Sequence, residues 1–361
     1  MKLLRRLTLI AIRFVSFIFK NSEIKQRVVL VSYFSRNPEG NLKCIEDYLK
    51  RNTDIEIVEL YSAFKGGLRN KLSYAFHTLK EAYYFNTSKV LVLEGNSLVL
   101  SSINKKPGVK AIQVWHAAGA FKKFGMDTKR LYPVKGLDEV FVNCEKVRPI
   151  YAKALNVPLE GVKCIGIPRM DAVCENFSKD VRKKMESKYP ALKGKKIALY
   201  APTFRGKGIS DIDMIEVDYA RLSQAVGNDY VLAVRLHPMM TQQIDAAVNF
   251  SNEDLIECLA AADLLITDYS SIIFEYSVFD RPMLFYAPDL QSFLGERGFY
   301  FGYEGFIPGR LCKNYDDIQV AVKNGDFNEK RRAEFIKEFD LKIDGKATYR
   351  AAMDIIEALK G

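Results

Sequence analysis

The chain has 361 residues, which is too long for one ordinary hydrophobic core and indicates two domains. Hydrophobic residues make up 48% of it and charged residues 27%, which excludes a disordered chain. The net charge of +10 indicates an anionic partner. The six cysteines are scattered and form no CxxC pair, which argues against a disulfide framework or zinc site and favours a reducing cytoplasm.

Residues 1–22 are predicted to form an amphipathic helix. At about 100° per residue, its basic side chains fall nearly on one line and apolar side chains cover the far side. Such a helix lies in the plane of an anionic membrane, and Arg13 interrupts the apolar run that a spanning helix needs. We therefore expect peripheral attachment to the cytoplasmic face of the cell membrane. Packing of the helix on the protein itself, and a signal or spanning segment, are the alternatives.

Short β-branched runs then alternate with segments of helical length, which predicts parallel sheets covered on both faces. The first group of runs lies in residues 23–170 and the second in residues 197–330, so these ranges are the two predicted domains. Residues 171–196 form the linker and residues 331–361 the C-terminal helices. Ligands of two doubly wound domains facing a cleft bind beyond the carboxyl ends of strands. The predicted strands are residues 28–32, 55–60, 90–93, 111–114, 140–143, 162–167, 197–201, 230–236, 264–267 and 283–286.

His116 follows a predicted strand and the chain's only tryptophan, Trp115. Small residues, Gly119 among them, come next and allow a substrate to approach the backbone. A histidine in this position suits a general base, because its usual pKa is near neutrality. Lys122 and Lys123 then offer charges to an acceptor phosphate or a membrane. The alternative is a histidine hydrogen-bonded inside a turn.

His237 ends a strand of the second domain, because Pro238 disfavours its continuation. Arg235 lies two residues back on the same side of that strand, where a cation fits a phosphate. Thr203 and Arg205 follow another strand and suit an anion as well. The alternative for His237 is a strand-end histidine that binds a backbone carbonyl.

The segment that most strongly indicates a ligand site runs from residue 262 to residue 289. A strand ends at Thr267, and Ser270 and Ser271 then open a helix whose free N–H groups and dipole suit a phosphate. Glu275 lies about one turn further on, in a position to accept both hydroxyls of a ribose. An N-capping serine and a surface glutamate are the alternative.

Three common nucleotide motifs are missing from the sequence. It contains no Gly-rich Walker loop and no GxGxxG after a strand, which argues against P-loop and dehydrogenase chemistry. It also contains no DxD pair near a strand end, so we expect neither a metal nor another cofactor. The densest basic cluster is in the amphipathic segment rather than among stacking aromatic residues, so we expect no nucleic-acid partner.

Together these residues resemble the CDP-glycerol glycerophosphotransferase family of wall teichoic acid synthesis. The resemblance covers about residues 28–289. Ala117 stands where the long-chain polymerases of the family usually have glycine, so the chain is most similar to the family's primases. The motifs are Trp115-His116, Ala201-Pro202-Thr203-Phe204-Arg205, Arg235-Leu236-His237-Pro238, and Thr267-Asp268-Tyr269-Ser270-Ser271 with Glu275 and Pro282.

The resemblance implies a GT-B fold in which the first domain faces the acceptor and the second binds the donor. It implies transfer of glycerol phosphate from CDP-glycerol to an undecaprenyl-diphosphate-linked disaccharide, with release of CMP. His116 is then the base, and His237 stabilises phosphate charge with the two serines and Arg205. The alternatives are a polymerase that adds glycerol or ribitol phosphate to a growing chain, and a UDP-sugar glycosyltransferase or epimerase.

Overall fold

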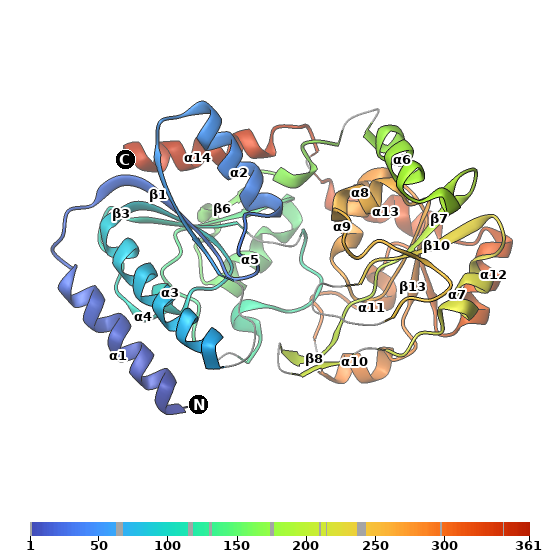
Figure 1. Cartoon of the computed structure of the whole chain (residues 1–361), viewed down its shortest axis with the longest axis horizontal. Helices are drawn as coiled ribbons and strands as arrows, with labels where there is room; N and C mark the ends of the chain where they lie inside the picture. Colours follow the sequence, from blue (N-terminus) through green and yellow to red (C-terminus); the bar gives the residue numbers. More distant parts are fainter. Residues whose placement is uncertain are drawn as a thin grey trace. The chain divides into compact units, whose positions relative to one another are not determined.

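The computed structural model describes residues 2–62, 68–114, 118–129, 132–173, 177–208, 211–213, 215–236, 243–296, 298–341 and 343–361. The chain divides into two compact units (Figure 1). The first comprises Met1–Ala118, Phe124–Asp171 and Lys342–Gly361. The second comprises Gly119–Lys123 and Ala172–Leu341.

In the described part of the first unit, parallel strands form a six-stranded sheet in the order β2-β1-β3-β4-β5-β6. Crossover segments, most of which contain a helix, connect successive strands, as parallel pairing requires. The elements are α1 (Lys2–Ile18), β1 (Lys25–Ser32), α2 (Gly40–Asn52), β2 (Glu56–Tyr61), α3 (Leu68–Thr87), β3 (Ser88–Glu94), α4 (Leu98–Ser102), β4 (Lys110–Val114), β5 (Glu139–Val142), α5 (Arg148–Leu155), β6 (Val162–Cys164) and α14 (Ala347–Lys360).

Helices α2 and α14 cover one face of this sheet and lie side by side (Figure 1). Alternate residues of β1 and β3, such as Leu30 and Val92, are fully buried against Ile45 of α2 and Ile355 of α14. This two-residue alternation is the pattern that a strand presents to one layer of helices. The last helix of the chain is therefore part of the first unit's core.

Helix α1 packs on α3 with one side and exposes apolar residues on the other. Ile12 is fully buried, Asn86 of α3 donates a hydrogen bond to Ser16 Oγ at 3.1 Å, and the rings of Phe19 and Tyr83 are 4.7 Å apart. Leu7, Ile10, Phe14 and Phe17 are more than half exposed. No helix in the described residues is long and apolar enough to cross a membrane.

Among the described residues of the second unit, a six-stranded parallel sheet has the order β11-β10-β7-β12-β13-β14, and β8 and β9 form a separate antiparallel pair. The elements are α6 (Phe177–Lys188), β7 (Lys196–Tyr200), β8 (Arg205–Gly208), β9 (Asp211–Asp213), α7 (Tyr219–Val226), β10 (Tyr230–Val234), β11 (Val248–Asn249), α8 (Leu255–Ala261), β12 (Leu264–Thr267), α9 (Ile272–Tyr276), β13 (Met283–Tyr286), α10 (Leu290–Glu296), α11 (Tyr303–Phe306), β14 (Arg310–Cys312), α12 (Tyr315–Asn324) and α13 (Glu329–Phe339).

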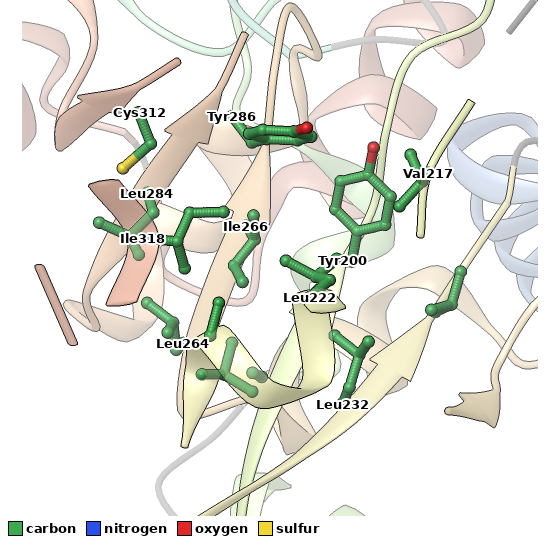
Figure 2. Packing of buried hydrophobic residues seen from close by; sticks show 14 of the residues in the cluster. Tyr200, Val217, Leu222, Leu232, Leu264, Ile266, Leu284, Tyr286, Cys312 and Ile318 are labelled. Atoms are coloured by element: carbon green, nitrogen blue, oxygen red, sulfur yellow. The ribbon is translucent and has the colours of Figure 1, made fainter. Parts of the chain in front are cut away.

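One core cluster of this unit lies between the sheet and the helices α7 and α12. Figure 2 shows Tyr200, Ile266 and Leu284, from three adjacent strands, facing Leu222 of α7 and Ile318 of α12. Residues that point to the opposite face, such as Leu265, are fully buried as well, which explains why the strands of this unit read as continuous apolar runs in the sequence.

The prediction of two parallel-sheet α/β domains is confirmed. The compact units differ from the predicted domain ranges in three places. Residues 119–123 belong to the second unit, α14 belongs to the first, and α6 packs on α8 rather than standing alone as a linker. Arg182 of α6 and Asp263 form an ion pair at 2.8 Å that helps to hold α6 in place.

Candidate functional site

The candidate site lies where β7 and β12 end in the second unit. The chain passes from β7 to β10 on one side of β7 and later returns to β12 on its other side. This reversal makes the carboxyl ends of β7 and β12 the topological switch point, at which open parallel sheets bind ligands. Thr203 and Arg205 follow β7, and Asp268, Ser270 and Ser271 follow β12.

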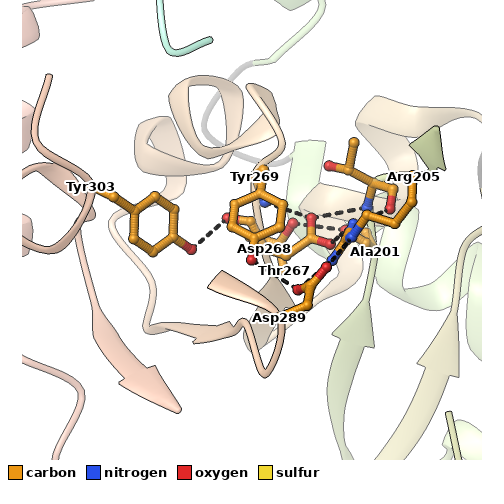
Figure 3. Close-up of polar contacts among 8 residues, drawn as sticks. Ala201, Arg205, Thr267, Asp268, Tyr269, Asp289 and Tyr303 are labelled. Carbon is orange, nitrogen blue, oxygen red and sulfur yellow. Dashed lines mark hydrogen bonds and ion pairs between the residues drawn. The ribbon is translucent and has the colours of Figure 1, made fainter. Parts of the chain in front are cut away.

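A buried ion-pair cluster ties these strand ends together (Figure 3). Arg205 Nη1 donates to Asp268 Oδ2 at 2.8 Å, and Arg205 Nε donates to Asp289 Oδ2 at 2.6 Å. Asp268 also accepts from the backbone N–H of Thr203 at 2.9 Å, and Tyr269 donates its hydroxyl proton to Asp289. The cluster therefore links the segments after β7, β12 and β13 into one rigid base.

The charges in this cluster stabilise each other. Burial alone would lower the pKa of Arg205, but the charge of Asp268 and the hydrogen bonds to Asp289 and Asp268 raise it above its usual value. Burial alone would raise the pKa of Asp289, but the hydrogen bond from Arg205 and its charge hold it below its usual range. Arg205 and Asp289 consequently both stay ionised at neutral pH.

Ser270 and Ser271 stand at the start of α9, as the sequence predicts. Both are half-buried, and Ser271 occupies the N-cap position without a side-chain capping hydrogen bond. The hydroxyl of Ser270 accepts from the backbone N–H of Ile272 at 3.4 Å, which is a long hydrogen bond. Glu275 lies within α9, as predicted, but its side chain is fully buried and not on the surface.

Thr203 Oγ1 is a further polar atom of this site. It is buried and has no hydrogen-bond partner among the described residues. Such an atom carries a desolvation cost that a ligand hydroxyl or phosphate oxygen would remove. Its neighbour Thr267 is satisfied, because its hydroxyl donates to the carbonyl of Ala201 at 2.7 Å.

Arg235 contacts a neighbouring segment rather than the loops after β7 and β12. Its Nη2 donates to the carbonyl of Glu253 at 3.4 Å, just before α8. Burial raises the pKa of the Cys258 thiol to about 12, although the charge of Arg235 acts in the opposite direction. The guanidinium therefore lies toward the start of α8.

The segment Gly119–Lys123 docks on the second unit. Gly119 has a positive φ of 64°, and a Cβ there would lie 2.2 Å from the ring of Phe274. Phe121 lies 4.9 Å from the ring of Phe306, and the Lys123 backbone N–H donates to the carbonyl of Gly298 at 2.8 Å. Lys122 pairs with Phe299 in an antiparallel bridge. The predicted acceptor-side residues Gly119, Lys122 and Lys123 thus belong to the unit that holds the two serines.

Trp115, His116 and His237 lie outside the described residues. The flanking residues are described: Val114 ends β4 of the first unit, and Leu236 is buried shortly after β10 of the second. The predicted roles of Trp115, His116 and His237 therefore remain predictions.

Asp268 and Asp289 were not predicted as the partners of Arg205. A signal was present, because each aspartate follows a predicted strand of the same parallel sheet and carboxyl ends of neighbouring strands meet at one edge. The aromatic cluster that receives Phe121 had no comparable signal. Its members Phe299, Tyr303 and Phe306 lie outside any recognisable periodic element.

The fold and the switch-point loops define a class, the two-domain α/β proteins that bind a ligand at the carboxyl ends of parallel strands. The chain belongs to the CDP-glycerol:poly(glycerophosphate) glycerophosphotransferase family, whose model matches residues 13–357. It is therefore an enzyme of the polyol-phosphate transferase type, and the family predicted from the motifs is confirmed.

Relatives within the family include both primases and polymerases. The chain is 33% identical to a teichoic acid ribitol-phosphate primase of Bacillus spizizenii, over 90% of each protein. It is 32% identical to a teichoic acid glycerol-phosphate primase of Bacillus subtilis, over 75% of this chain and 74% of that protein. A structure of the wall teichoic acid polymerase TagF matches with a TM-score of 0.76 at 20% identity, over 99% of this chain and 95% of that one.

Proposed function

We propose that the chain acts as a primase, which transfers one glycerol phosphate from CDP-glycerol to an undecaprenyl-diphosphate-linked disaccharide and releases CMP. The observation that carries this proposal is the pair of half-buried serines at the switch point of a chain in this family. The similarity to primases over most of their length supports a single transfer.

The donor phosphates bind at the hydroxyls of Ser270 and Ser271 in this proposal. Neither hydroxyl caps α9 with a strong hydrogen bond, so both are available to anionic oxygens. Thr203 Oγ1 supplies a third hydroxyl at the same edge of the sheet. Because Glu275 is fully buried, its contact with the cytidine ribose requires the chain around it to open when the donor binds.

Arg205 positions this site instead of contacting the phosphate. Its guanidinium already donates to two carboxylates and to the carbonyl of Thr203, and one cation facing two carboxylates does not attract a phosphate. For Arg235 we likewise propose a supporting role, because its guanidinium binds the segment before α8.

The two predicted histidines, His116 and His237, have different roles in the reaction. In this proposal His116 deprotonates the acceptor hydroxyl, and His237 stabilises charge on the transferring and leaving phosphates. Positioning and electrostatics then supply most of the rate, as in other phosphoryl transfers. His116→Ala should lower turnover about 10²–10⁴-fold with little effect on donor affinity. His237→Ala should impair both quantities, and the reverse pattern would contradict the assignment.

Transfer of ribitol phosphate from CDP-ribitol is the second candidate. The observation in its favour is the 33% identity to a ribitol-phosphate primase. A polymerase that adds glycerol or ribitol phosphate to a growing chain is a further alternative, since a poly(ribitol-phosphate) polymerase is 29% identical over 98% of this chain.

Calorimetry with CDP-glycerol, CDP-ribitol and a UDP-sugar tests the donor site. We expect CDP-glycerol to bind most tightly, and Ser271→Ala to weaken it by about 1.5–3 kcal/mol through loss of a hydrogen bond to a charged group. Ser187→Ala is the matched control, because Ser187 is an exposed serine of α6 in the same unit. Equal affinity in the Ser271→Ala protein, or tighter binding of the UDP-sugar, would overturn the donor assignment.

A further inference from the structure

An open groove of about 490 Å³ lies in the first unit between the edge strand β2 and helix α3. Val58 and Leu60 of β2 alternate with Ile57 and Tyr61, which pack on the side of the sheet that α2 and α14 cover. Val58 and Leu60 therefore point to the other side, where α3 lies. We call this hollow the α3 groove, and its apolar and aromatic lining residues are Phe19, Val58, Leu60, Leu79, Tyr83 and Tyr84.

Helix α3 has apolar residues on a side that does not face the core. Glu81 and Phe85 are buried and mark its inner side. Phe76, Leu79 and Tyr83 are spaced by three and four residues, which places them on one stripe. Phe76 is 69% exposed, and Leu79 and Tyr83 are only half-buried. The stripe is about 11 Å long, and such a surface indicates a binding partner, here an extended chain rather than a compact ring.

The apolar lining of the groove continues into helix α1. The helices α1 and α3 lie side by side in the first unit (Figure 1). Phe19, directly after α1, lines the groove, and its ring lies 4.7 Å from the ring of Tyr83. Phe17 and Ile18 precede it and are more than half exposed. The lining therefore runs on into the exposed apolar residues of the helix that we expect to lie at the membrane.

The charges beside the groove favour a ligand with an anionic head group. Glu59 lines the groove, but its carboxylate forms an ion pair with Lys50, and the hydrogen bond from Lys50 lowers the pKa of Glu59. Lys80 lines the groove as well and is exposed. Lys20, which directly follows Phe19, is exposed too. Cations beside an apolar lining are complementary to a phosphate group at the end of a hydrocarbon chain.

We propose that the α3 groove binds the isoprenoid chain of the lipid-linked acceptor next to its diphosphate, with Lys80 as the cation that faces the diphosphate. A single chain matches a single groove, whereas a bilayer phospholipid brings two chains. This inference rests on the proposed transfer to a lipid-linked disaccharide and deepens it, because it assigns a place to the lipid part of the acceptor.

The Leu79→Gln variant tests the groove with little risk to folding, because Leu79 is only half-buried. The KM for the disaccharide on its full isoprenoid chain should rise about tenfold. The KM for an analogue that carries the same diphosphate on a short water-soluble chain should stay the same, as should donor affinity and the midpoint of thermal unfolding. Leu159→Gln is the matched control, since Leu159 is 46% exposed in the same unit and does not line the groove.

Two further measurements separate the groove from general membrane attachment. Co-sedimentation of the Leu79→Gln protein with anionic vesicles should be normal, because the exposed side of α1 is intact. An isoprenyl diphosphate with a photoreactive benzophenone on its chain should label the peptide that contains residues 76–84, and Leu79→Gln should reduce that labelling. This labelling requires no turnover.

Several outcomes would overturn the inference. One is an unchanged KM for the full-length acceptor in the Leu79→Gln protein, and another is an equal rise for the short-chain analogue. Loss of vesicle binding by Leu79→Gln would make the groove part of a bilayer-facing surface instead. Labelling only outside residues 76–84 would also contradict it. If the unsubstituted protein uses no CDP-linked donor, the proposed function fails, while the labelling still tests the groove, so the two failures are distinguishable.

Discussion

Gly119 packs so closely against the ring of Phe274 that no other residue fits at position 119. A Cβ on Gly119 would lie 2.2 Å from both Cε2 and Cζ of the Phe274 ring, and the backbone φ is 64°. Gly119 follows His116 by three residues, and Phe274 directly precedes Glu275. The contact therefore anchors the segment after the predicted base onto the helix that carries a predicted donor residue.

Gly119→Ala should lower the free energy of unfolding by about 2–4 kcal/mol, because it adds both a steric clash and a strained φ. Denaturant unfolding measures this change. Gly295→Ala is the control, since no atom lies within 4 Å of a Cβ built at Gly295. A Gly119→Ala protein as stable as the control would show that the segment does not dock on α9.

Arg205→Leu should destabilise the protein by about 3–5 kcal/mol, because it leaves Asp268 and Asp289 without their cation. Removal of a partly exposed arginine from the same unit, in Arg310→Ala, should cost less than about 1 kcal/mol. Thermal unfolding of both variants at neutral pH makes the comparison. Similar losses in the two would mean that the cluster does not hold the strand ends together.

The elements that sequence analysis predicted best are those whose burial leaves a pattern. Residues 28–32 and 264–267 are continuous apolar runs because both faces of their sheets are covered, and they became β1 and β12. The strands β11 and β14 are two and three residues long, too short for any periodicity to appear. Local patterns also do not encode which layer a helix joins, and so α14 was not assigned to the first unit.

Sequence separation likewise decided which residues of the candidate site could be predicted. Ser270, Ser271 and Glu275 share one strand-to-helix turn, so their spacing was visible in the sequence. The partners of Arg205 lie 63 and 84 residues away, and only the sheet order brings them together. Periodicity within a segment does not carry that information.

Stability should fall as the pH rises from about 4.5 to about 7. Burial raises the pKa of Glu81 from 4.5 to about 7 in the folded protein, so the folded state keeps a proton that the unfolded state has released. Proton linkage then makes the free energy of unfolding decrease across this window and level off above it. Glu81→Gln should make this decrease shallower in urea unfolding measured at pH 5, 6, 7 and 8. An identical pH profile would show that Glu81 does not hold its proton.

Vesicle binding should depend on the exposed side of α1. The variant with Leu7→Ser, Phe14→Ser and Phe17→Ser removes apolar groups that do not contribute to the core. It should therefore lose most of its co-sedimentation with anionic vesicles while it unfolds at the same temperature. A variant with Met126→Ser and Leu159→Ser, which alters exposed apolar residues elsewhere in the first unit, should bind normally. Full binding by the α1 variant would exclude this helix as the attachment.

We propose that this chain carries out a single transfer from a CDP-linked polyol to a lipid-linked disaccharide. Its most direct test is CMP release by the purified protein with CDP-glycerol, in the presence and absence of the disaccharide acceptor, with mass analysis of the lipid product. We expect CMP release that requires the acceptor, and a product that carries one glycerol phosphate. Release of a nucleoside diphosphate from a UDP-sugar instead, or a product that grows to many glycerol phosphate units, would contradict it.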